Sequence, residues 1–194
     1  SDIGVGKGTH IGILLNNSTE FVTIILAVAD LGATMVPMSS TTSSNAIFTA
    51  ISVSNIDYMI GWHATLEDFL DRTQDKLALS RQRCISVGRE IDGCLSFKEM
   101  LKTAPETYEL GKRVIDDETD FILTMTSGST SDPKPIVFTQ GTKIRRILNA
   151  QELYDITEED ITLVATPLYH SISQRLVLIP IISGGTAVIM QKFT

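Results

Sequence analysis

Basic residues are scarce in this chain of 194 residues, and their scarcity excludes two classes of partner. Lys and Arg together number 16 against 23 Asp and Glu, which gives a net charge of −7. Nucleic-acid binders and proteins that dock on anionic membranes need clustered positive charge. We therefore expect neither a nucleic acid nor a membrane surface as a partner.

Cysteines and long apolar runs are equally few. Cys84 and Cys94 are the only cysteines, too few for a disulfide framework, which favours a reducing compartment. The longest apolar stretches, residues 24–29 and 176–182, are far shorter than the roughly 20 residues of a membrane span. No basic segment followed by an apolar one opens the chain, so we expect no signal peptide. These features predict a cytoplasmic domain that acts on small molecules or proteins.

Charge is unevenly distributed along the sequence. Residues 1–60 carry four acids and one base, residues 61–120 carry thirteen and nine, and residues 121–194 carry six and six. This distribution predicts that the first and last thirds form core and that the middle is a solvated, irregular surface region.

The first third has a strand–helix–strand pattern. Residues 10–15 form an apolar strand candidate, and residues 16–18 offer polar caps for a helix over 18–31 that is apolar on most sides. Gly32 can end that helix in the left-handed conformation, and residues 33–37 return as a second strand. Such a unit normally has a right-handed crossover in a parallel sheet.

The last third repeats the pattern. Residues 120–126 and 136–138 read as strands, and 142–154 as an amphipathic helix with Ile144, Ile147, Leu148 and Leu153 inward and Lys143, Arg145, Arg146 and Glu152 outward. Residues 161–166 form a strand, 173–182 a helix interrupted near Pro180, and 185–190 the last strand. The sequence therefore predicts a layered α/β fold with parallel βαβ units.

The segment with the clearest chemistry is residues 126–135, T-S-G-S-T-S-D-P-K-P. Backbone N–H groups around Gly128, the hydroxyl groups and Lys134 are suited to holding a polyphosphate. The segment is not a Walker A loop, because Pro133 and Pro135 stand where that motif has a glycine and the magnesium-binding hydroxyl. A plain turn rich in Ser, Thr, Gly and Pro is the alternative, and composition alone favours it.

The same segment resembles the signature loop of the adenylate-forming superfamily, which comprises acyl- and aryl-CoA ligases, luciferases and the adenylation domains of peptide synthetases. Ser131 departs from the pattern, because the family usually has glycine there. Residues 6–37, 165–171 (A-T-P-L-Y-H-S) and 183–193 are similar to three further family segments in the same order. The resemblance thus extends over nearly the whole chain.

The resemblance implies that residues 1–194 are part of a large N-terminal AMP-binding domain, with a first α/β unit and variable surface region at 1–115 and a phosphate-loop unit at 116–194. It implies an ATP-dependent acid–thiol ligase that joins a carboxylic acid to CoA, with Mg²⁺ and a place in fatty acid metabolism. The residues it assigns to the ATP phosphates are Thr126, Ser127, Gly128, Ser129, Thr130 and Lys134. Lys134 would stabilise phosphate charge, and Thr130 would meet Mg²⁺ through ATP.

His170 lies in the P-L-Y-H segment, and the resemblance implies that it forms a wall of the carboxylic-acid pocket. Without the family, a core histidine bonded to a backbone carbonyl is the commoner role. Amino-acid adenylation domains usually carry an aspartate near this segment, and residues 167–173 have none. An amino-acid substrate is therefore the less favoured alternative within the family.

The family also has motifs that this sequence lacks: an adenine-binding segment, a ribose-binding aspartate and a C-terminal catalytic lysine. We therefore expect a fragment that is inactive alone. A non-catalytic relative that binds a nucleotide or a protein remains the alternative from another class. The sequence leaves the acid, the thiol and the oligomeric state open.

Overall fold

The computed structural model describes residues 3–73, 79–105, 115–126 and 134–192. Its main element is a seven-stranded sheet in the order β5-β4-β3-β1-β2-β6-β7. The strands are β1 (His10–Leu14), β2 (Thr34–Pro37), β3 (Tyr58–Trp62), β4 (Cys84–Val87), β5 (Leu95–Ser96), β6 (Asp120–Thr126) and β7 (Lys134–Thr139). All neighbours pair in parallel except β6 and β7, which form an antiparallel hairpin.

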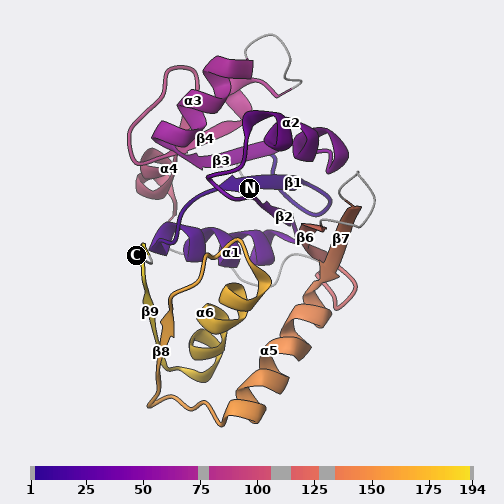
Figure 1. Ribbon diagram of the computed structural model, residues 1–194, viewed down its shortest axis with the longest axis vertical. Helices are drawn as coiled ribbons and strands as arrows, with labels where there is room; N and C mark the ends of the chain where they lie inside the picture. The colour runs from indigo at the N-terminus through magenta and orange to yellow at the C-terminus, as the bar shows by residue number, and fades with distance from the viewer. Residues whose placement is uncertain (1–2, 74–78, 106–114, 127–133, 193–194) are drawn as a thin grey trace.

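Helices cover both faces of this sheet (Figure 1). α2 (Ser44–Val53) and α3 (His63–Thr73) lie over one face, and α1 (Thr19–Leu31) lies along the other. α5 (Gln140–Tyr154), α6 (Ser171–Ser183) and a two-stranded parallel sheet of β8 (Ile161–Val164) and β9 (Thr186–Ile189) form the lower half of the view. The short α4 (Phe97–Thr103) and a 3₁₀ turn, η1 (Arg81–Arg83), complete the elements. The layered α/β fold is therefore confirmed.

Two cores follow from the alternation of side chains along the strands. On β1, Ile13 belongs to the core that also includes buried residues of α1, α5 and α6, whereas the adjacent Leu14 belongs to the core that includes those of α2 and α3. On β2, Met35 and Val36 divide in the same way. α1 is thus sandwiched between the large sheet and the lower unit, as an apolar helix should be.

The first unit forms largely as its sequence predicts. The Ser18 hydroxyl caps α1 by accepting a hydrogen bond from the Phe21 N–H at 3.2 Å. Gly32 ends the helix with φ of 65°, and β2 then pairs in parallel with β1. α1 is apolar on most sides as predicted, but it is not buried all round, because Leu26 is 44% exposed.

The middle third is not the irregular surface region that its charge predicts. It supplies β4, β5 and the end of β3 to the sheet and α3 to one core. Leu66, Phe69 and Leu70 line the inner face of α3, while Asp68 and Arg72 form an ion pair on its outer face at 2.8 Å. Charge density was misleading here because the helix is amphipathic.

Two further expectations for the last third were wrong. β6 and β7 do not join the later strands but extend the large sheet, with β6 parallel to β2. α6 is also not interrupted at Pro180. The helix runs to Ser183 and ends at Gly184, whose φ is 81°. Pro180 lies inside the helix and is buried. The division of the chain after residue 115 stays a prediction.

No helix in the described part of the chain has the length and apolar character needed to cross a membrane.

Candidate functional site

The ends of the predicted phosphate loop are brought together by the β6–β7 hairpin. Thr126 closes β6, Lys134 opens β7, and the two residues pair across the hairpin. Ser127, Gly128, Ser129 and Thr130, with the variant position Ser131, lie outside the described residues. Their assignment to phosphate, and that of Thr130 to Mg²⁺, stays a prediction. The loop follows β6, a parallel strand, at the edge of the sheet where open α/β folds bind ligands.

A cavity of about 690 Å³ opens at this same edge. Its walls come from the end of β2 and the loop after it, from α2, from the β6–β7 hairpin, from α5 and from the residues that lead into α6. The lining residues are apolar or hydroxyl-bearing, with one histidine and one arginine: Pro37, Met38, Ser39, Thr42, Ala46, Thr49, Ala50, Thr124, Met125, Phe138, Arg146, Tyr169, His170 and Ser171. None of these is a carboxylate.

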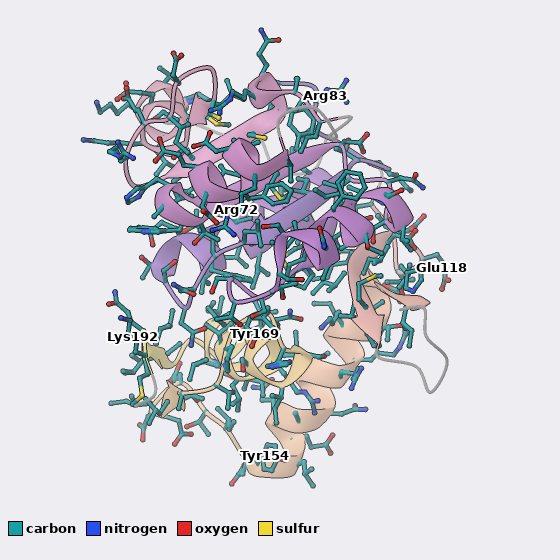
Figure 2. The ribbon with its side chains drawn as sticks, turned by 45° about the horizontal axis from the view of Figure 1, so that its top comes forward. Arg72, Arg83, Glu118, Tyr154, Tyr169 and Lys192 are labelled. Carbon is teal, nitrogen blue, oxygen red and sulfur yellow. The ribbon has the colours of Figure 1, made fainter. Side chains whose placement is uncertain are left out.

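His170 lines this cavity, and its predicted place in the wall of a carboxylic-acid pocket stays a prediction. It is exposed rather than buried in the core, and its ring lies 4.3 Å from the Tyr169 ring, centroid to centroid. Figure 2 places Tyr169 where the lower unit meets the large sheet, far from Tyr154 at the end of α5. The alternative of a core histidine bonded to a backbone carbonyl therefore does not hold for His170.

The segment that carries His170 is anchored to the first unit by Asn17. The Asn17 side-chain amide donates to the carbonyl oxygens of Thr166 and Met190, each at 3.0 Å. Its carbonyl oxygen accepts from the backbone N–H of Leu168 at 2.7 Å. Asn17 follows β1, so one buried side chain joins the first strand–helix connection, the P-L-Y-H segment and the end of β9. The sequence alone predicts only a helix-capping role for this asparagine.

A second buried amide holds the same segment from the other side. Gln174, in the first turn of α6, is completely buried. Its amide group donates to the carbonyl oxygens of Leu168 at 3.1 Å and Tyr169 at 3.5 Å. Its own carbonyl oxygen accepts from the Lys143 ammonium at 2.8 Å. Buried polar groups that are fully paired in this way fix one local conformation.

The position of Lys143 differs most from the prediction, which placed this residue on the outward face of the helix. Its side chain is only 5% exposed, and its ammonium also donates to the Ser171 hydroxyl at 3.2 Å. α5 packs this face against α6, while Ile144, Leu148 and Leu153 are exposed. The ammonium also lies 5.3 Å from the Phe138 ring centroid, within cation–π range. The helix was predicted correctly, but Lys143 was assigned to the wrong face. The lysine can be buried because neutral oxygen atoms accept hydrogen bonds from its ammonium.

The pKa of Lys143 is lowered to about 8, first by burial and then by the nearby positive charges of Arg146 and Arg175. Its ordinary value is 10.5, so between about pH 8 and 10.5 the unfolded chain binds more protons than the folded one. Stability therefore rises with pH across this window. The cost of keeping the lysine charged is fully present below the folded value.

This linkage gives a testable pH dependence. Lys143→Met in the full-length protein should remove the rise in stability between about pH 8 and 10.5, which amounts to at most about 3 kcal/mol. Denaturant unfolding at several pH values measures it. The exposed Lys98 on α4 provides the control, since Lys98→Met should leave the slope as it is in the wild type. An identical slope in wild type and Lys143→Met would contradict the assignment.

No group of three or more His, Cys, Asp and Glu side chains in the described part of the chain is placed to hold a metal ion. Burial raises the pKa of the Cys84 thiol to about 12, which keeps it protonated and unreactive.

The fold and this site match a known family over the full chain. Residues 1–194 match the AMP-binding enzymes. The chain belongs to this family. The resemblance carried by the T-S-G-S-T and P-L-Y-H segments is thereby confirmed.

The relatives of this AMP-binding chain include CoA ligases. It is 29% identical over 199 residues to 4-coumarate–CoA ligase 3 of Oryza sativa subsp. japonica, covering 98% of this chain and 34% of the relative. It is 28% identical over 203 residues to a dimodular nonribosomal peptide synthase of Bacillus subtilis, covering 98% of this chain and 7% of the synthase. A solved long-chain-fatty-acid-CoA ligase from Archaeoglobus fulgidus superposes with a TM-score of 0.87 at 25% identity, over 98% of this chain and 37% of that one.

This AMP-binding chain thus spans about a third of the length of the CoA ligases that it matches. Within that third, the structure brings together the ends of the phosphate loop, the cavity and His170. The residues that the sequence analysis missed are Asn17, Gln174 and the buried Lys143. In the sequence, these three residues are marked only by being polar at positions that the helical period or the order of segments places near the core.

Proposed function

We propose that this chain is the phosphate-loop portion of an AMP-forming acid–CoA ligase. The observation that carries the proposal is the cavity at the carboxyl-terminal edge of the sheet, which touches the end of β6 and is lined by His170. A carboxylic acid seated there lies next to the loop that would hold ATP. The family match and the CoA ligases among the relatives support the same activity.

The reaction would have two steps. A carboxylate oxygen attacks the α-phosphorus of ATP, a P–O bond forms, and the bond to pyrophosphate breaks. The thiolate of CoA then attacks the carbonyl carbon of the acyl adenylate, and AMP leaves with the oxygen that came from the acid. ATP and CoA are substrates, and Mg²⁺ would accompany the triphosphate.

In the first step the loop acts electrostatically. The hydroxyls and backbone N–H groups of residues 126–130 and the ammonium of Lys134 would offset the charge that develops on the leaving pyrophosphate. His170 and Tyr169 would form the wall against the acid. Asn17, Gln174 and Lys143 would hold that wall in place without touching substrate.

The role of Lys134 is open to direct test. Lys134→Ala in the full-length protein should lower acid-dependent exchange of pyrophosphate into ATP by about 10²-fold, as for the loss of one stabilising donor. Lys192, which is exposed near β9, gives the matched control, because Lys192→Ala should leave exchange unchanged. Unchanged exchange in Lys134→Ala would refute the role.

Amino-acid activation is the second candidate, favoured by the peptide synthase among the relatives. The described lining of the cavity argues against it, since no carboxylate is present to pair with a substrate ammonium. A screen in which only amino acids support exchange would reverse this order. Binding of ATP with no exchange for any acid would favour a non-catalytic relative, to which Ser131 in the loop points. A fatty acid and a cytoplasmic location remain expectations of the proposal.

A further inference from the structure

Three cations gather beside the cavity. Lys143, Arg146 and Arg175 together line a gap of about 10 Å³ between α5 and α6. Within the described residues, none of the three forms an ion pair. Lys143 has only the neutral oxygens of Gln174 and Ser171 as hydrogen-bond partners. The neighbouring Arg145, by contrast, pairs with Asp117 at 3.1 Å.

Such a cluster is unusual in a chain whose net charge is −7. Each cation repels the others, and the buried lysine lacks the counter-ion that normally compensates burial. A bound anion would supply the missing charge. Arg146 is the member that lines the large cavity, so it is the one that an anion in the cavity would meet.

Arg146 is also held in an orientation suited to this task. Its guanidinium carbon lies 5.2 Å from the Phe138 ring centroid, and Phe138 lines the cavity as well. Stacking on an aromatic face restrains the guanidinium while its N–H groups remain available to donate two parallel hydrogen bonds to a planar acid group. Carboxylates are the groups that this geometry recognises best.

The position of Arg146 separates this anion from the ATP phosphates. Phe138 is four residues from Lys134 along β7, which corresponds to about 13 Å of extended strand. The guanidinium, which lies beside Phe138, is therefore separated along β7 from Lys134, where the predicted phosphate loop ends. The lining of the cavity also includes the apolar side chains of Met38, Ala46 and Met125.

We propose that Arg146, supported by the field of Lys143 and Arg175, binds a second, distal carboxylate on the acid substrate. This inference rests on the proposed function and names its substrate class: dicarboxylic acids with an apolar spacer. One carboxylate reaches the loop for adenylation, the spacer lies along the apolar lining, and the other carboxylate pairs with Arg146.

The test uses pyrophosphate exchange by the full-length protein, because CoA takes no part in that half-reaction. Straight-chain α,ω-dicarboxylic acids are compared with monocarboxylic acids of equal carbon number. The wild type should have the higher kcat/KM with the diacid of the best-fitting length. Arg146→Gln should lower kcat/KM for that diacid by about tenfold or more and leave the monoacid within about twofold, because only the diacid loses a charge-assisted bond.

Two further variants and one measurement serve as controls. Arg145→Gln removes the same charge one residue away, outside the cavity, and should change neither substrate. Arg146→Lys should recover part of the diacid activity, since it restores charge without the bidentate fork. Thermal unfolding of each variant shows whether the protein remains folded, and an unchanged monoacid rate shows that the site does.

The outcomes separate the two proposals. If no carboxylic acid supports exchange, the proposed function itself fails. If exchange occurs but monoacids are preferred, or if Arg146→Gln lowers both substrates equally, only the distal-carboxylate inference is overturned. An effect of Arg146→Gln confined to the KM for CoA in the complete reaction would assign the anion to CoA and would also overturn it.

Discussion

Replacing Asn17 with alanine in the full-length protein is expected to lower the free energy of unfolding by about 2–4 kcal/mol. The substitution removes three hydrogen bonds, two to the carbonyl oxygens of Thr166 and Met190 and one from the buried N–H of Leu168. That N–H then has no partner and bears the cost of desolvation. Denaturant unfolding measures the loss of stability.

The same substitution should also reduce acid-dependent pyrophosphate exchange by about 10²-fold, because displacing a wall of the site by about 1 Å has effects of this size.

Asn16 offers a matched control. It is the exposed neighbour, and its side chain makes one exposed bond, from the Ser40 hydroxyl at 2.5 Å. Asn16→Ala should change stability by less than about 0.5 kcal/mol. Equal effects of the two substitutions would contradict the anchoring role of Asn17.

Gln174→Leu is expected to be still more disruptive, with a loss of about 3–5 kcal/mol. Leucine has a similar volume, so the change tests the polar contacts rather than the packing. It removes the acceptor at 2.8 Å from Lys143 and leaves a buried ammonium with only the Ser171 hydroxyl as acceptor. It also releases the carbonyl oxygens of Leu168 and Tyr169 from their donor. Unfolding measurements below pH 8, where Lys143 is charged, should show the full effect.

Two further variants sharpen this prediction. Gln174→Glu keeps an oxygen acceptor for Lys143 and loses only the two donors, so its loss should be smaller than that of leucine. Gln151 on α5 makes one long bond, to the Ile156 carbonyl oxygen at 3.4 Å, and Gln151→Leu should be nearly neutral. A loss for Gln174→Leu no greater than that for Gln151→Leu would show that the buried network does not stabilise the fold.

The regular part of the fold could be predicted because its signals are local. Ser18 caps α1 and Gly32 ends it, and the strand on each side is apolar. The partners of β6 and β7 could not be predicted, because sheet order depends on contacts between residues far apart in sequence. Met35, for example, pairs with Ile122 across 87 residues. Pro180 misled for a related reason, since burial outweighs the local tendency of proline to end a helix.

The site divides in the same way. Thr126, Lys134 and His170 belong to short segments whose order and spacing point to a known chemistry, and the structure places their backbones around one edge of the sheet. Asn17, Lys143 and Gln174 act through hydrogen bonds to other segments, and the bonds of Asn17 reach across as many as 173 residues of sequence. The helical period assigns Lys143 to the solvent-facing side because lysine is polar. The neutral hydrogen-bond acceptors on α6 nevertheless allow Lys143 to be buried. Three-dimensional contacts were needed to find them.

The most direct test of the central claim follows an oxygen atom. The full-length protein is given an acid labelled with ¹⁸O in its carboxylate, together with ATP, Mg²⁺ and CoA, and the nucleotide product is analysed by mass spectrometry. The proposed reaction transfers one carboxylate oxygen to the α-phosphate, so AMP should carry a single ¹⁸O and ADP should be absent. Unlabelled AMP, or ADP with ¹⁸O in inorganic phosphate, would contradict activation of the acid as an adenylate.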